Sequence, residues 1–209
     1  MSDRVWSTRC TLRDKGGDLV IVLGKEPSDT FLSDEPVSVL FVPVSEAEWN
    51  AALSPWRADA VFRRAPAFEG LADEWLAAVL PEIRTIRKAY SGRCFVGGYS
   101  LAGLCALYLC TMTEEFDGCL SASGSLWYPG FAEYLKEHPV RCAHVYLSIG
   151  DREKESKNNV LAQAETKTEE CRALLSGYTD VTFERNPGNH FQMEEERLEK
   201  GVRWLRSRN

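Results

Sequence analysis

The sequence predicts an α/β protein with a mostly parallel central sheet and helices on both of its faces. Short apolar runs rich in β-branched and aromatic residues alternate along the chain with longer segments of helical periodicity, which is the pattern of strands joined by crossover helices. Several runs are apolar at almost every position, as in strands buried on both faces. Because 44% of the 209 residues are hydrophobic, we expect one core and a single domain over residues 1–209.

Seven segments are predicted to be strands. The first two alternate polar and apolar residues and predict an antiparallel edge. The last four are short and dense in Val, Phe, Cys and Leu, and they predict central strands. In chain order, the seven segments are residues 5–12, 18–23, 37–44, 93–98, 118–121, 143–149 and 181–184.

Four segments are predicted to be helices, namely residues 71–90, 101–112, 160–175 and 193–205. The first has apolar residues at three-to-four spacing, but Pro81 should kink or split it. The second is almost wholly apolar and predicts a buried helix. Residues 45–70 lack periodicity yet contain Trp49 and Trp56, so we expect this long loop to pack as the wall of a pocket.

Composition and charge narrow the classes of partner. The net charge of −6 and the pI near 5.2 argue against nucleic-acid binding, which depends on clustered Lys and Arg. The chain has no run of about 18 apolar residues, so no membrane span is predicted. Residues 1–13 are too polar for a signal peptide, and we therefore expect a cytoplasmic protein. Seven widely spaced cysteines indicate small buried side chains and not a zinc site. We expect a small-molecule partner and no cofactor.

The motif that points to chemistry is the Gly-x-Ser-x-Ala-Gly turn over residues 98–103. An apolar strand precedes it and a buried helix follows it, which is the setting of a nucleophile elbow. In such a turn the serine adopts a strained backbone and projects its hydroxyl above the sheet, so its neighbours two positions away must be small. Gly98 and Ala102 meet that requirement, and Ser100 is the candidate nucleophile.

A serine hydroxyl needs an adjacent base, and the chain has three histidines. His138 falls at a polar helix end, and His144 lies within a predicted strand. His190 stands in a turn-rich loop between the last strand and the last helix, where an elbow serine finds its base. The acid should follow the strand at 143–149, where Asp151 and Glu153 compete; the position of Glu153, three residues after Gly150, favours it.

The developing oxyanion of such a reaction needs two backbone N–H donors. One should be the amide of Leu101, the residue after the nucleophile. The other is expected from the loop after the third predicted strand, residues 45–50. The sequence does not choose among the amides of this loop, and Trp49 is taken as the candidate.

With these motifs the chain resembles the family of α/β-hydrolases that contains esterase D, the S-formylglutathione hydrolases and the enterochelin-type siderophore esterases. The resemblance runs from residue 37 to the carboxy terminus and rests on residues 98–103, 123–128, 150–153 and 188–191. It implies an α/β-hydrolase fold. Because the chain is short, we expect no sizeable cap domain and a shallow, open pocket.

The resemblance also implies an activity, the serine-dependent hydrolysis of a carboxylic ester or thioester through an acyl-enzyme. Ser100 carries over as nucleophile, His190 as base and Glu153 as acid. The residues expected to bind substrate are Tyr99, Ser125, Trp127 and Tyr128. Two alternatives stay open: a scaffold that binds a small molecule or protein without catalysis, and an acyltransferase that uses the same residues.

Overall fold

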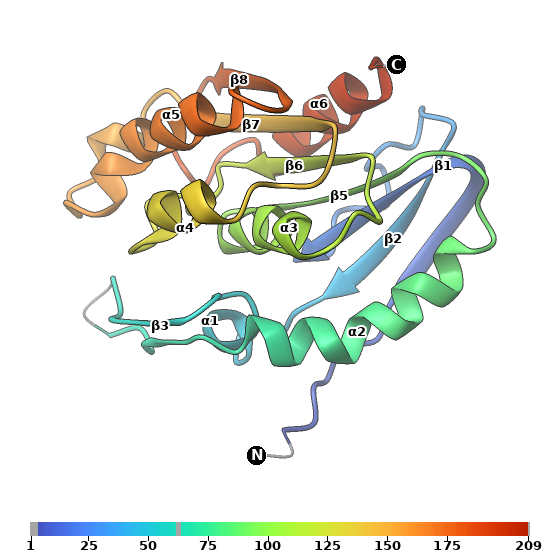
Figure 1. The fold of residues 1–209 in the computed structure, drawn as a ribbon, viewed down its shortest axis with the longest axis horizontal. Helices are drawn as coiled ribbons and strands as arrows, with labels where there is room; N and C mark the ends of the chain where they lie inside the picture. The colour runs from blue at the N-terminus through green and yellow to red at the C-terminus, as the bar shows by residue number, and fades with distance from the viewer. Residues whose placement is uncertain (1–3, 62–63, 209) are drawn as a thin grey trace.

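The computed structural model describes residues 4–61 and 64–208 and contains the expected parallel sheet (Figure 1). Six strands lie side by side in the order β2-β1-β5-β6-β7-β8, and a separate two-stranded sheet pairs β3 with β4. The strands of the large sheet are β1 Thr11–Gly24, β2 Val37–Pro43, β5 Cys94–Tyr99, β6 Gly118–Ala122, β7 His144–Gly150 and β8 Asp180–Asn186. The small sheet consists of β3 Arg57–Ala58 and β4 Phe68–Glu69.

The first strand differs from its sequence-based prediction. Residues 18–24 pair in parallel with β2 on one side and with β5 on the other, and Leu19 to Leu23 are at most 1% exposed. This segment is therefore a central strand and not an edge. The antiparallel edge is limited to residues 11–13, whose partners run backwards from Phe41 to Val39. Gly16 and Gly17, with φ of 70° and 72°, form the turn between the two parts.

The helices cover both faces of the sheet, as predicted. The carboxy-terminal α6, Glu194–Arg206, packs Leu198, Val202 and Leu205 on one face. The other helices cover the opposite face. They are α1 Trp49–Ala52, α2 Ala72–Arg87, α3 Leu101–Met112, α4 Phe131–Glu137 and α5 Ala164–Leu175. Two short 3₁₀ turns, η1 Glu153–Glu155 and η2 Leu161–Gln163, lie between β7 and α5.

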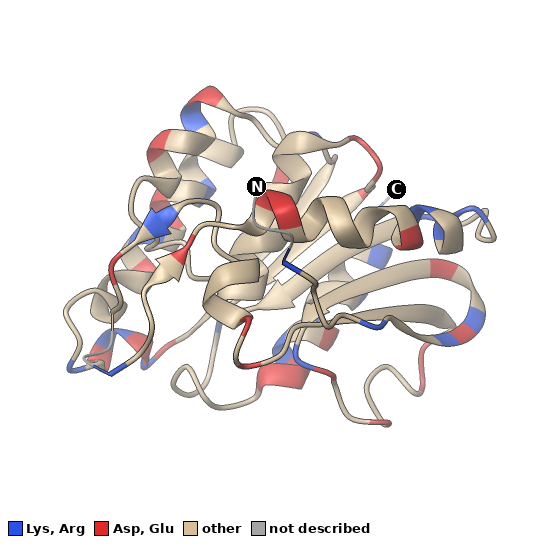
Figure 2. Cartoon of the chain, turned by 90° about the horizontal axis from the view of Figure 1, so that it is seen from below, with Lys and Arg blue, Asp and Glu red and all other residues tan. Residues whose placement is uncertain are grey.

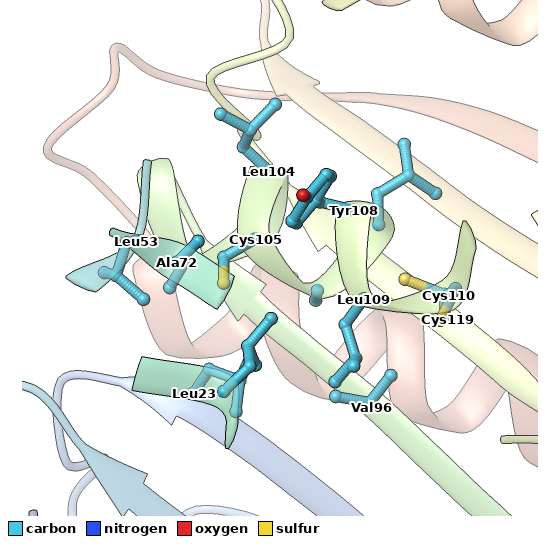
Figure 3. Close-up of a cluster of buried hydrophobic side chains, with 14 of the residues drawn as sticks. Leu23, Leu53, Ala72, Val96, Leu104, Cys105, Tyr108, Leu109, Cys110 and Cys119 are labelled. Atoms are coloured by element: carbon cyan, nitrogen blue, oxygen red, sulfur yellow. The ribbon is translucent and has the colours of Figure 1, made fainter. Parts of the chain in front are cut away.

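The buried helix α3 forms the centre of the core (Figure 3). Almost every one of its residues is buried, because it packs on β1, β5 and β6. Its Tyr108 also donates a hydrogen bond to Asp73 of α2. Leu104 and Leu109 contribute the apolar contacts, while Cys105 and Cys110 act as small hydrophobes. Burial raises the pKa of the Cys105 thiol, so it stays protonated. All seven cysteines lie within the described residues and are unpaired, and six are buried.

The structure refines two expectations for the segment 45–87. Pro81 lies inside α2 without splitting it, since the helix runs continuously over Ala72–Arg87. The segment 45–70, expected to be a long loop, contains α1 and the small sheet. Ser45, Glu46 and Trp49 from its beginning do line a cavity, as predicted.

Charged residues of both signs are interspersed along the ribbon (Figure 2). Most of the ion pairs are surface pairs, such as Arg84 with Glu115 and Arg185 with Glu165. In the described part of the chain, 4–61 and 64–208, none of the helices combines the length and apolarity needed to cross a bilayer.

Candidate active site

The turn between β5 and α3 has the strained geometry expected of a nucleophile elbow. Ser100 has φ 59° and ψ −123°, a conformation that costs on the order of 1–3 kcal/mol for a residue with a side chain. A methyl group on Gly98 would come within 2.6 Å of the Ala102 backbone, so only glycine lets the chain turn here. The turn is held because the Ser100 N–H donates to the carbonyl of Ala122 at 3.0 Å. The Ser100 hydroxyl thus projects from the carboxyl end of the sheet.

His190 lies next to this hydroxyl, although 90 positions separate the two residues in sequence. Its Nε2 atom is 2.9 Å from Ser100 Oγ. The loop that carries it follows β8, because Gly188, at φ 102°, turns the chain back towards the elbow. The sheet order explains the contact, since β5 and β8 end at the same edge of the parallel sheet.

Glu153 completes a hydrogen-bonded chain of three side chains. Its Oε2 atom is 2.8 Å from His190 Nδ1, and its Oε1 atom accepts the Gly150 N–H at 2.8 Å. The side chain is buried at the start of η1. Burial alone would raise its pKa, but the hydrogen bond and charge of His190, with the N–H of Gly150, hold the pKa of Glu153 below its ordinary value. The carboxylate is therefore ionised, and the Nδ1–H of His190 donates to it.

Asp151, the competing candidate for the acid, is not directed at His190. Its Oδ1 atom accepts the backbone N–H of Gly188 at 2.9 Å. In the turn after β7, the backbone N–H of Asp151 donates to the carbonyl of Asn186 in β8. This bond leaves the Asp151 side chain beside the loop of His190 and not beneath its imidazole. Of the two carboxylates, only Glu153 reaches His190.

Arg197 was missed in the sequence analysis, yet it lies directly behind the acid. It is 0% exposed, and its Nη1 atom donates to Glu153 Oε1 at 3.0 Å. A signal was present in the sequence: Arg197 is four residues before Gly201 and shares the buried face of α6 with Leu198 and Val202. An arginine on an apolar stripe requires a buried acidic partner.

Trp49, the candidate for the second oxyanion donor, does not follow the strand that lies beside β5. Trp49 follows β2, but the strand beside β5 is β1, whose Leu23 pairs with Gly98. The segment next to the elbow is therefore Gly24–Lys25. The Trp49 ring instead packs over Gly24, where a Cβ would come within 3.0 Å of it.

Two cavities flank the Ser100–His190 pair. The larger has a volume of about 560 Å³, with an apolar wall formed by Val22, Leu23, Phe41, Val44, Trp49 and Leu198. Its charged lining residues are Lys25, Glu26, Glu46, Glu194 and Glu195. The smaller, of about 420 Å³, is lined by Trp127, Leu161, Ala164, Arg152 and Glu155 among others. Phe191, which is 75% exposed, lies between the two.

The expected substrate-binding residues divide into two groups. Tyr99 lines the larger cavity and Trp127 the smaller. Ser125 is buried, with its Oγ atom 3.5 Å from that of Ser100. Tyr128 is also buried: its hydroxyl donates to the carbonyl of Trp56 and its ring packs on Phe68 at 5.1 Å. It supports the site from the core and does not form a cavity wall.

No protein-family model matches the sequence, and no curated protein matches it either. Solved structures do resemble it. An IroE-like serine hydrolase from Shewanella oneidensis has a TM-score of 0.73 at 14% identity, with 94% of this chain and 74% of that chain covered. The siderophore hydrolase EstA from Aspergillus nidulans has a TM-score of 0.62 at 19% identity, with 92% of this chain and 83% of that chain covered.

A third similar structure is MGS-MChE2, an α/β-hydrolase enzyme from the metagenome of lagoon sediments at Mar Chica, Morocco. It has a TM-score of 0.57 at 16% identity and covers 98% of this chain and 97% of that chain. These likenesses define the class of protein by its fold. The chain has the α/β-hydrolase fold that the resemblance implied, and no sizeable cap domain is present among residues 4–61 and 64–208.

Proposed function

We propose that this protein is a serine-dependent hydrolase of carboxylic esters or thioesters. The observation that carries the proposal is the hydrogen-bonded chain from Glu153 through His190 to Ser100, at 2.8 and 2.9 Å, on a strained elbow. Because the Nδ1–H of His190 donates a hydrogen bond to Glu153, the free lone pair of Nε2 faces the Ser100 hydroxyl. This is the arrangement that a weak nucleophile needs for activation.

The reaction follows from this geometry in two displacements. Ser100 Oγ attacks the carbonyl carbon while its proton moves to His190 Nε2, and Glu153 stabilises the imidazolium that results. His190 then gives the proton to the leaving oxygen or sulfur, and the acyl group stays on Ser100. Water, activated by the same imidazole, adds to the acyl-enzyme and releases the acid.

Two backbone amides are suited to hold the oxyanion. The Leu101 N–H is in the first turn of α3, where amides have no intrahelical acceptor and the helix dipole favours negative charge. The Lys25 amide follows Gly24 at the end of β1, the strand beside the elbow. Donors in such positions stabilise the tetrahedral intermediate by about 3–4 kcal/mol each.

The comparisons support this proposal at the level of class. Two of the similar structures are a serine hydrolase and a siderophore hydrolase. A siderophore ester is one substrate to test, together with simple aryl esters and thioesters. Acyl transfer would use the same three residues, so products should be analysed in the presence of added alcohols and amines.

The proposal is tested with Ser100→Ala. We expect the variant to hydrolyse an activated ester about 10⁴- to 10⁶-fold more slowly than the wild type, because the acyl-enzyme no longer forms. A fluorophosphonate probe should label the wild type on Ser100 and leave the variant unlabelled. Ser176→Ala, at the far end of α5, is the matched control and should behave as the wild type. Wild-type turnover by Ser100→Ala, or no labelling of folded wild-type protein, would reject the mechanism and favour a non-catalytic scaffold.

A further inference from the structure

We propose that Arg197 is the positioning residue of this active site. From α6 it fixes the Glu153 carboxylate and the His190 loop in one arrangement, and it sets the pH range over which His190 accepts the Ser100 proton. The kinetic part of this inference rests on the proposed function, whereas the positioning part concerns the folded protein and can be measured without turnover.

One terminal nitrogen of Arg197 is directed at the acid and its surroundings. Nη1 donates to Glu153 Oε1 at 3.0 Å, to Ser123 Oγ at 2.7 Å and to the Tyr99 hydroxyl at 2.9 Å. Ser123 has a left-handed backbone with φ of 45°, which directs its hydroxyl into this cluster. The carboxylate is thus held from both sides, with Arg197 on Oε1 and His190 on Oε2.

The other terminal nitrogen holds the loop that carries the base. Nη2 donates to the carbonyl of Pro187 at 3.1 Å and to that of Asn189 at 3.0 Å, immediately before His190. Tyr99, itself bound to Nη1, donates its hydroxyl to the carbonyl of His190 at 2.7 Å. The planar guanidinium fork therefore connects acid and base through fixed hydrogen bonds.

Glycine makes room for this contact. A Cβ on Gly150, the last residue of β7, would come within 2.7 Å of Arg197 Nη2 and 2.3 Å of the Gly188 carbonyl. Burying a guanidinium is costly, and a buried ion pair adds little stability over apolar residues of the same volume. The geometry that the guanidinium imposes is thus a better explanation for its presence than its contribution to folding.

The charge of Arg197 also affects proton transfer. Glu153 faces the guanidinium, the imidazole, the Gly150 N–H and the neutral hydroxyls of Ser123 and Tyr99. Without the guanidinium, less positive charge offsets the carboxylate, so the Glu153–His190 pair holds a proton to higher pH. The other charged groups near His190, which line the two cavities and were named above, are the same in wild type and variant.

The test compares Arg197→Met and Arg197→Lys with the wild type in pH profiles of kcat/KM. In Arg197→Met we expect kcat to fall about 10²-fold, as for a misplaced catalytic group, with KM nearly unchanged and the acid limb at higher pH. Arg197→Lys keeps the charge without the fork, so the acid limb should return to its wild-type position while the rate recovers only in part. Arg203→Met, which loses surface ion pairs of the same helix, is the control and should match the wild type.

A double-mutant cycle separates positioning from general destabilisation. If Arg197 acts through Glu153, Arg197→Met should lower kcat by a much smaller factor in the Glu153→Gln protein than in the wild type. Fully additive losses in kcat would overturn the inference. If the methionine variants do not fold, the Arg197→Lys and Glu153→Gln/Arg197→Lys proteins give the same comparison.

A measurement without substrate keeps this inference distinct from the proposed function. In NMR titrations of the His190 imidazole, the midpoint should lie at higher pH in Arg197→Met than in wild type and Arg203→Met. Superimposable titrations would overturn the inference even if Ser100→Ala is inactive. Conversely, active Ser100→Ala would reject the hydrolase mechanism, and the imidazole titration would still decide the role of Arg197.

Discussion

At the scale of single residues, the site depends on one carboxylate that is bound by two side chains, the imidazole of His190 and the guanidinium of Arg197. Glu153 is buried, ionised and bound on both oxygens, which fixes the tautomer of His190 and the direction of its free lone pair. The carboxylate of Asp151, only two positions away, accepts a hydrogen bond from the backbone N–H of Gly188. Two neighbouring acids therefore have different hydrogen-bond partners because their local turns point them in different directions.

This difference gives a prediction for two matched amide substitutions. Glu153→Gln should reduce kcat by at least about 10²-fold and up to about 10⁴-fold, because the imidazolium loses its counter-charge and the tautomer is no longer fixed. Asp151→Asn keeps an oxygen that can accept the Gly188 N–H, so its rate should stay within about threefold of wild type. Steady-state kinetics on one activated ester measure kcat for both variants. Equal losses in the two variants would contradict the assignment of Glu153 as the acid.

At the scale of elements, the β5–α3 turn is tightly packed against its neighbours. Its strain at Ser100 is supported by the burial of α3 in the core and by contact of Gly98 with Ala102. Gly24 at the end of β1 approaches the same alanine, since a Cβ there would lie 2.9 Å from that of Ala102. Three elements thus converge with no space for additional atoms, and this holds Ser100 in place.

We therefore expect Gly98→Ala to affect stability and activity together. The added methyl group would contact the Ala102 backbone, and overpacking of this kind costs about 1–3 kcal/mol in the free energy of unfolding. The forced shift of α3 should also displace Ser100 and lower kcat. Urea denaturation and ester kinetics measure the two effects.

Gly177→Ala is the matched control for this substitution, because its nearest non-neighbouring atom would be 3.4 Å from the new Cβ. It should unfold within about 0.5 kcal/mol of wild type. If Gly98→Ala were as stable and as active as this control, the close packing at the elbow would be refuted.

At the scale of the whole molecule, the sheet edge brings together an apolar cavity and a negatively charged rim. Four glutamates and Lys25 line the larger cavity, and Lys25 is already 3.6 Å from Glu194. The net charge of the chain is −6, so the long-range field has the same sign. A substrate that approaches Ser100 from this side meets a negative potential over an apolar wall.

Anionic esters should consequently be poorer substrates than neutral or cationic esters of the same shape. Each carboxylate about 10 Å from a substrate charge contributes about 0.4 kcal/mol in water, so a few of them give about a three- to tenfold difference in kcat/KM at low salt. Added salt should reduce that difference by screening. The measurement compares a neutral acyl ester with its carboxylate and trimethylammonium analogues, in wild type and Glu46→Gln. Faster turnover of the anionic ester at low salt would contradict this prediction.

Sequence patterns alone predict the α/β alternation, the strand–turn–helix segment around Ser100 and the loop position of His190. These features are local: an apolar strand, a turn of small residues and an apolar helix leave a pattern within about 20 residues, and turn residues mark the loop of the base. The extent of α3 was also predicted correctly, because residues 101–112 are apolar at nearly every position.

Tertiary structure alone decided which segments meet across the sheet. The position of Glu153 three residues after Gly150 already favoured it over Asp151, but its contact with His190 depends on the strand order β7-β8. The contact of Arg197 with Glu153 and the place of Gly24–Lys25 beside the Ser100 turn likewise depend on how distant elements pack. Strand order reflects the packing of helices far apart in sequence, and no local pattern records it. Local patterns therefore specified the individual groups, whereas the packing of distant elements specified their partners.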